Sequence, residues 1–254
     1  MNITKYLTIL LFLFISGSVT GWGIEVLFRR FISTANPERR WINPGFLMGP
    51  YVPLYGWGLV VLYAMASIPI PIENETLRKL VLFALMAVCM TLIEFLTGMW
   101  FLKKQHVRLW DYTARPGNIK GVICPLFSFF WAIIGAFYYF ILHPRVLNAL
   151  NWLADNMAFC LVIGFFYGIF AVDVVYSFRL VARIRQFAAE NDIIVRYEML
   201  KSNIRAGLEE KKEKWHFLMP FRSEVPIREH LERYLQLMAA FYEDKIGEKL
   251  NRRR

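Results

Sequence analysis

The sequence predicts an all-α polytopic membrane protein with about five transmembrane helices and a helical cytoplasmic tail. Hydrophobic residues make up 57% of the 254 residues and charged residues only 20%, a balance too apolar for an ordinary soluble domain. The apolar residues also come in long blocks, whereas a soluble core needs short amphipathic stripes. We therefore expect a transmembrane domain over residues 1–178 and a basic helical tail over residues 179–254.

Five apolar blocks approach the roughly 20 residues that cross a bilayer as a helix. They are Tyr6 to Phe31, Val52 to Ile68, Leu77 to Leu102, Val122 to Leu142 and Leu153 to Phe178. Ser16, Gly17 and Ser18 resemble a signal-peptide cleavage site, but the first apolar run continues past them to Phe28, which favours a retained span.

The distribution of basic residues predicts the orientation. Lys and Arg gather after the first and third blocks, while the opposite side holds few of them. Cytoplasmic loops carry the excess of positive charge, so the amino terminus is expected outside the cell membrane. An odd number of spans then places the tail in the cytoplasm. The basic residues of the two loops are Arg29, Arg30, Arg39, Arg40, Lys103, Lys104, Arg108, Arg115 and Lys120.

The net charge and the motifs limit the classes of partner and cofactor that the chain is expected to bind. The net charge of +10 indicates contact with anionic membrane lipids, and no nucleic-acid-binding motif is present, so no nucleic-acid partner is expected. Cys89, Cys124 and Cys160 stand apart in apolar segments, and the four histidines are scattered, so we expect no metal site. The sequence has no phosphate-binding G-x-x-x-x-G-K-[ST] loop, so we expect no cofactor, and ATP-driven work would need a separate ATPase subunit.

Two parts of the chain share a set of spacings. In each, an acid precedes a tryptophan by sixteen residues, and a following asparagine precedes a proline by seven. The sets are Glu25, Trp41, Asn43 and Pro50, then Glu94, Trp110, Asn118 and Pro125. This pattern predicts two parallel hairpin repeats, each a helix entering from outside, an irregular cytoplasmic segment and a returning helix. The alternative is that membrane hairpins resemble one another in general.

Glu25, Glu94 and Asp173 are acids that lie well inside the apolar blocks. A charge at membrane depth costs about 2.5–3.5 kcal/mol on insertion scales, so each should face protein or water. All three fall near the predicted cytoplasmic ends, where they would line one polar path. The alternative is that each acid reaches the interface or pairs with a nearby basic residue. Those basic residues are Arg29, Lys103 and Arg179.

Two irregular segments border this predicted path. Asn43 to Gly58 is rich in Pro and Gly yet apolar, which predicts a re-entrant or cavity-lining element, or an interfacial loop. Lys103 to Gly121 combines basic residues with aromatic ones; it would bind a phosphate-bearing headgroup, dock a soluble partner, or form a solvated basic loop. The residues added to the candidate path are Asn43, Trp110, Asp111 and Asn118.

Four motifs follow one another in a fixed order: Asn43 to Gly58, Glu94 to Gly98, Trp110 to Thr113 and Pro116 to Trp131. With these motifs, the region from about Thr20 to Gly135 resembles the putative ABC-transporter type IV permease family of bacterial membrane proteins. The resemblance implies a multi-pass transport component without its own ATPase. The chain has Pro44 where the family pattern has Arg, which removes a charge from the loop.

We expect a membrane transport component, permease-like and served by a separate ATPase, with Glu25 and Glu94 lining its path and no catalytic residues. A homo-oligomer is also compatible with the sequence. One alternative is a membrane-embedded enzyme acting on a lipid or lipid-linked substrate through Glu94, His106 and Asp111. Another is a noncatalytic scaffold that recruits a partner through the tail. Its expected helix face is Ile227, Leu231, Tyr234, Leu235, Met238, Phe241 and Tyr242.

Overall fold

A computed structural model of the chain describes residues 3–33, 36, 39–210, 221 and 225–251, and it is almost entirely helical. The predicted helical fold class is therefore confirmed. The helices are α1 (Ile3–Phe31), α2 (Pro53–Ser67), α3 (Glu75–Gln105), α4 (Pro125–Phe137), α5 (His143–Asp155), α6 (Cys160–Glu190), α7 (Tyr197–Glu210) and α8 (Ile227–Asn251). A π-helical turn, Tyr138–Leu142, joins α4 to α5, and a 3-10 turn, Met157–Phe159, precedes α6. The short strands β1 (Val107–Arg108) and β2 (Val195–Arg196) pair in parallel.

Within the described residues, four helical segments are long and apolar enough to cross a membrane: Tyr6–Phe31, Glu75–Gln105, Pro125–Leu153 and Cys160–Glu190. The predicted count of five is not confirmed. The block expected over Val52 to Ile68 forms α2, which has 15 residues. At 1.5 Å per residue it extends about 22 Å, short of the roughly 30 Å hydrocarbon core. The helix α3 runs beyond its predicted block at both ends, α1 begins three residues before its block, and α4 and α6 begin three and seven residues after the starts of theirs. The helix α6 continues through the predicted domain boundary at 178/179.

Close contact between α1 and α2 forms the first hairpin. A Cβ atom on Gly17 would come within 2.7 Å of Leu59, and one on Gly21 within 2.2 Å of Tyr55. Glycines at this four-residue spacing let membrane helices approach closely. The approach seats the Tyr55 ring directly on α1, one turn before Glu25.

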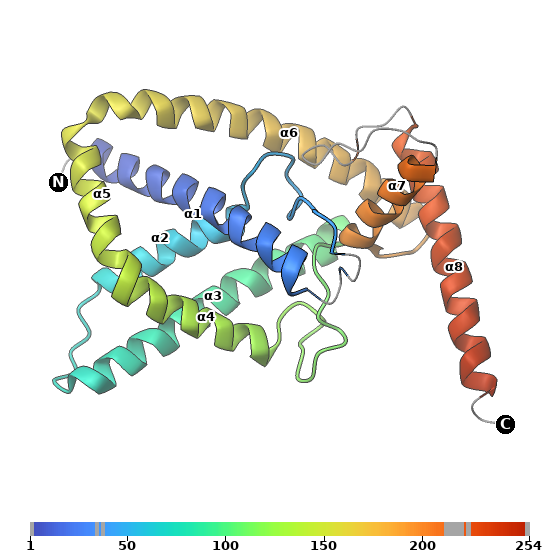
Figure 1. The fold of residues 1–254 in the computed structure, drawn as a ribbon, viewed down its shortest axis with the longest axis horizontal. Coiled ribbons are helices and arrows are strands. Elements are labelled where there is room, and N and C mark those ends of the chain that lie inside the picture. The colour runs from blue at the N-terminus through green and yellow to red at the C-terminus, as the bar shows by residue number, and fades with distance from the viewer. Residues whose placement is uncertain (1–2, 34–35, 37–38, 211–220, 222–224, 252–254) are drawn as a thin grey trace.

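The second hairpin, α3 and α4, packs beside the first. A buried cluster joins residues of α2, α3, α4 and the π-helical turn: Leu62, Leu82, Met86, Met90, Trp131 and Tyr138. Both returning helices begin with a proline, Pro53 in α2 and Pro125 in α4, where the missing N–H costs no hydrogen bond. The α1–α2 and α3–α4 connections lie at the end of the molecule that carries α7, and α5 lies at the other end (Figure 1).

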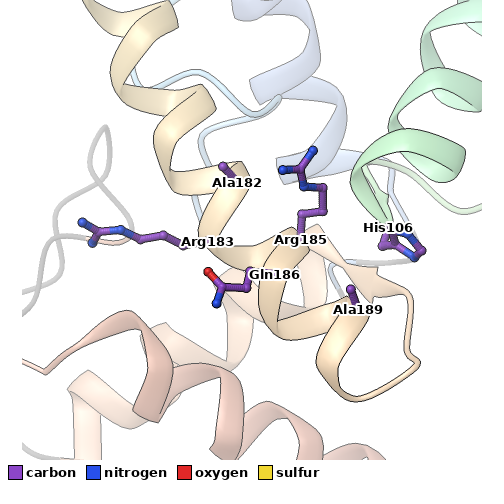
Figure 2. Close-up of a pocket in the computed structure, with 6 residues that line it drawn as sticks. All are labelled: His106, Ala182, Arg183, Arg185, Gln186 and Ala189. Atoms are coloured by element: carbon purple, nitrogen blue, oxygen red, sulfur yellow. The ribbon is translucent and has the colours of Figure 1, made fainter.

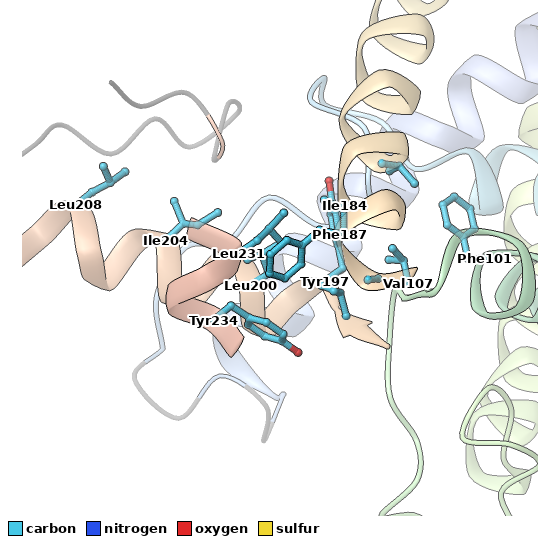
Figure 3. Close-up of a cluster of buried hydrophobic side chains, with 13 residues drawn as sticks. Phe101, Val107, Ile184, Phe187, Tyr197, Leu200, Ile204, Leu208, Leu231 and Tyr234 are labelled. Atoms are coloured by element: carbon cyan, nitrogen blue, oxygen red, sulfur yellow. The ribbon is translucent and has the colours of Figure 1, made fainter. Parts of the chain in front are cut away.

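The tail forms a hydrophobic cluster with the ends of α3 and α6. Figure 3 shows the side chains that α7 and α8 contribute to this cluster. Its members include Phe101, Val107, Ile184, Phe187, Tyr197, Leu200, Ile204, Leu208, Leu231 and Tyr234. The pairing of Val107 with Val195 joins the end of α3 to the start of α7. The tail is thus packed onto the α3 and α6 ends.

Replacing Gly21 with alanine tests the close approach of α1 and α2. We expect Gly21→Ala to lower the free energy of unfolding in detergent by about 1–3 kcal/mol, the usual cost of overpacking, because its Cβ would overlap the Tyr55 ring. Gly23→Ala is the matched control, since its Cβ would meet nothing within 4 Å. Thermal and denaturant unfolding followed by circular dichroism measure both. Equal stability of the two variants would refute the tight hairpin.

Candidate functional site

The carboxyl group of Glu94 is enclosed by donors from two other elements. Glu94 is only 3% exposed, and it accepts hydrogen bonds from Trp131 Nε1 at 3.1 Å and from Tyr112 Oη at 3.0 Å. Trp131 belongs to α4 and Tyr112 to the α3–α4 loop. A buried carboxyl group needs such donors because it has lost its water. Burial raises the pKa of Tyr112, and Glu94 raises it further, so Tyr112 keeps its proton and acts as the donor.

Glu25 is held in a corresponding way by the first hairpin. Its Oε2 accepts a hydrogen bond from Tyr55 Oη at 2.8 Å, and its Oε1 lies 2.9 Å from Arg29 Nη2 in an ion pair along α1. Arg29 also forms an ion pair with Glu198 of α7. Glu25 therefore connects α2 on one side with the tail, through Arg29, on the other.

Two aromatic rings join the acids. The ring centroids of Tyr55 and Trp131 are 5.7 Å apart, with the rings tilted by 58°. Tyr55 donates to Glu25 and Trp131 donates to Glu94, so the contact between the rings links the hydrogen-bonding groups of the two acids. We call this group the paired-acid site: Glu25, Arg29, Tyr55, Glu94, Tyr112 and Trp131.

Asp173 clamps the α1–α2 loop. Its hydrogen-bond donors in the described part of the chain are Met48 N at 3.1 Å, Gly49 N at 2.7 Å, Tyr51 Oη at 2.5 Å and Ser177 Oγ at 2.8 Å. These donors come from the loop and from α6 itself. Asp173 therefore fixes the loop against α6, at a place separate from the hydrogen bonds of Glu25 and Glu94.

The tail helix α7 covers the same loop. Lys201 Nζ donates to the carbonyl oxygens of Asn43 at 3.1 Å and Gly45 at 2.6 Å, and Tyr197 Oη donates to Phe46 O at 3.2 Å. Lys201 is buried and lies 4.7 Å from the centroid of the Tyr197 ring. The loop is thus held between α6 and α7, in the place where a re-entrant or cavity-lining segment was predicted.

The two predicted asparagines organise their own loops. Asn43 is buried; its Oδ1 accepts from Trp22 Nε1 at 2.7 Å and its Nδ2 donates to Met48 O at 2.9 Å. Asn118 Oδ1 accepts from Gly121 N at 2.9 Å, and its Nδ2 donates to earlier carbonyl groups of the α3–α4 loop. Each asparagine bonds main-chain groups of its own loop, so both residues hold their loops in shape.

Trp110 and Asp111 also fasten the α3–α4 loop. Trp110 Nε1 donates to Val122 O at 2.8 Å, which closes the loop across its base. Asp111 forms ion pairs with Arg108 at 3.1 Å and with Arg196 of β2 at 3.3 Å. Asp111 therefore connects the loop to the tail. Among the described residues, neither Trp110 nor Asp111 forms a hydrogen bond with Glu94.

The enzyme alternative has little support from these contacts. Glu94 is bonded by Trp131 and Tyr112, and Asp111 by arginines. His106 ends α3 with a left-handed backbone, φ 54°. Within the part of the chain that the structure describes, no hydrogen bond joins any two of Glu94, His106 and Asp111.

The scaffold alternative required a free apolar face on the tail. Leu231 and Tyr234 are buried in the tail cluster, and Ile227, Leu235 and Met238 pack against it. That face is therefore occupied within the chain. The side chains of Phe241 and Tyr242 lie outside the described residues.

A comparison with the sequence profiles of protein families matches residues 12–178 to the putative ABC-transporter type IV family. The chain belongs to this family. Searches of curated proteins and of solved structures found no significant match. Family membership and the long apolar helices together indicate a transport-related membrane protein, and every residue of the paired-acid site falls within the matched region.

Sequence reasoning did not assign Tyr55, Tyr112 or Trp131 to the polar path, nor Lys201 to the contacts that hold the α1–α2 loop. The sequence shows only that Tyr55 and Trp131 are aromatic hydrogen-bond donors on the two returning helices, two and six residues after Pro53 and Pro125. Lys201 carried no comparable signal, because its partners are backbone carbonyl groups far away in the sequence.

The pH dependence of stability tests the burial of Lys201. Burial, together with the charge of Arg29, lowers the pKa of Lys201 from 10.5 to about 7. Between these two values the unfolded chain binds more protons than the folded one, so this group makes stability rise with pH. We expect the unfolding midpoint to rise more between pH 7 and pH 9 in the unmodified protein than in Lys201→Met. Identical pH profiles would contradict the buried, bonded lysine.

Proposed function

We propose that this chain is the permease-like membrane subunit of an ABC-type transporter, driven by a separate ATPase. Its polar path lies near the cytoplasmic side and is lined by Glu25 and Glu94. The family membership supports a transport role, and the paired-acid site carries the proposal. Two acids from two hairpins, joined through a pair of aromatic rings, provide a polar place enclosed by protein at membrane depth.

The proposal includes the topology. The α1–α2 and α3–α4 hairpins are parallel repeats, with the amino terminus outside and both hairpin loops and the tail in the cytoplasm. The common position of these loops and α7 supports this arrangement (Figure 1), as does the concentration of Lys and Arg in the loops. The short helix α2 inserts against α1 as a fifth, partial span.

The tail offers a route for coupling to ATP hydrolysis. Glu198 of α7 pairs with Arg29, and Arg29 pairs with Glu25. Movement of α7 by a bound ATPase would therefore change the environment of Glu25 directly. Two discrete arrangements of such a linked element are what energy coupling between distant sites requires.

Affinity purification of the full-length chain from its native membrane, in mild detergent, tests the partner. We expect mass spectrometry to find a soluble ATPase with a phosphate-binding loop at about one copy per chain. The proposed subunit role would be wrong if only membrane lipid and further copies of the chain were recovered after gentle cross-linking.

Charge removal at Glu94 tests the path without breaking its hydrogen bonds. In Glu94→Gln the amide oxygen can accept from Trp131 Nε1 while the amide nitrogen donates to Tyr112 Oη, so the fold should survive. We expect Glu94→Gln and Glu25→Gln to lower ATP-dependent flux at least about tenfold, the effect of losing about 1.4 kcal/mol of charge stabilisation.

Flux is measured as the change in small-molecule content of vesicles with and without the transport complex, by untargeted mass spectrometry. Glu75→Gln is the control, because Glu75 is an exposed acid on the same helix that pairs only along its surface with Lys79. Unchanged flux in both test variants, with the ATPase still bound, would rule out the acidic path.

A further inference from the structure

A pocket of about 580 Å³ opens on α6 close to the end of α3. It is lined by His106, Ala182, Arg183, Arg185, Gln186 and Ala189. Figure 2 shows Ala182, Gln186 and Ala189 along α6, with Arg183 on one side and Arg185 and His106 toward the other. The pocket therefore has a floor of small and neutral side chains and basic side chains at its edges.

The floor continues a lipid-exposed face of α6. Val172 is 72% exposed and Val175 is 54% exposed on a helix apolar enough to span a membrane. Ala182 and Gln186 stand seven and eleven residues after Val175, so they share its helix face. Ala182 lies about 10 Å further along the axis, at 1.5 Å per residue. Acyl chains on this face would lead directly to the pocket.

The depth of the pocket is that of lipid headgroups. Tyr176 of α6 and Trp100 of α3 are both exposed, and exposed aromatic residues near helix ends mark the membrane interface. Arg183 and His106 follow them by seven and six residues on the same two helices. The basic edges of the pocket therefore lie just beyond the interface, where lipid phosphates lie.

The charges of the pocket are available to a ligand. Within the described ranges no acid forms an ion pair with Arg183 or Arg185, and both side chains are exposed. The nearest acid along α6, Glu190, already accepts a hydrogen bond from Gln186 Nε2 at 2.9 Å. Arginine guanidinium groups bind phosphate oxygens through two parallel N–H donors.

The far wall is held in place by the tail. His106 ends α3 with its N–H bonded to Phe101 O, and its carbonyl oxygen accepts from Val195 N at 2.9 Å. A preorganised wall lowers the entropy lost on binding.

We propose that this pocket binds the phosphate-bearing headgroup of an anionic membrane phospholipid whose acyl chains lie along the Val172 and Val175 face of α6. Arg183 and Arg185, on opposite sides of the pocket, supply the positive charge that attracts the phosphate. The site lies outside the paired-acid site and does not depend on the proposed transport function. It also places the lipid against the helix end that packs with α7 and α8, so an anionic membrane would stabilise the packed tail.

Native mass spectrometry of the purified full-length chain in mild detergent tests this proposal, with phosphatidylglycerol and phosphatidylcholine as probes. We expect tighter binding of phosphatidylglycerol. Arg183→Gln with Arg185→Gln should weaken that binding about 30-fold, since each basic residue at an anionic surface contributes about 1 kcal/mol, while phosphatidylcholine binding stays the same. Ala182→Phe, which fills the exposed floor without changing charge, should weaken it as well.

The control removes the same charge elsewhere. Arg78→Gln with Arg228→Gln changes two exposed arginines, one at the opposite end of α3 and one on α8, and should keep the lipid preference. Circular dichroism confirms that each variant is folded. The proposal is overturned if the unmodified chain shows no preference, or if the Arg183 and Arg185 variant keeps it. Displacement of the lipid by equimolar inorganic phosphate would overturn the membrane source and leave a site for soluble phosphate.

Discussion

A carboxyl group buried at membrane depth must be hydrogen-bonded, and the arrangement of the hairpins follows from meeting that requirement at Glu94. Its two donors come from different elements, so α4 and the α3–α4 loop must both lie against α3. Gly98 makes this possible, because a Cβ there would come within 2.4 Å of Val122. The hydrogen bond from Trp110 Nε1 to Val122 O closes the base of the α3–α4 loop. This closure keeps Tyr112 within hydrogen-bond distance of Glu94.

The other parts of the fold are connected to Glu94 through Glu25 and its partners. Glycines on α1 bring Tyr55 onto Glu25, and the contact of Tyr55 with Trp131 brings the first hairpin to the second. The tail is attached through Arg29 and Glu198. A change at α7 therefore has a short physical route to both acids, which the proposed coupling to a separate ATPase would use.

Sequence patterns predicted the coarse fold well because membrane helices are marked by long apolar blocks, and four blocks form helices of spanning length. The block at Val52 to Ile68 has only 17 residues, and it forms the 15-residue helix α2 within those bounds, which is why the count of five spans is not confirmed. The ion pair of Glu25 with Arg29 could be predicted, because residues four apart on a helix are neighbours. The partners of Glu94, and all those of Asp173 except Ser177, come from other elements and depend on packing that no local pattern encodes. The repeat, the orientation and the domain boundary stay predictions.

The central claim is that Glu25 and Glu94 share one protein-enclosed site. A double-mutant cycle measures this most directly, with the free energy of unfolding in detergent determined for the unmodified chain, each single Glu-to-Gln variant and the double variant. Neighbouring acids that feel each other's charge should give a coupling energy above about 0.5 kcal/mol, because neutralising one relieves the repulsion on the other. Effects that add within about 0.3 kcal/mol would mean that the two acids stand apart.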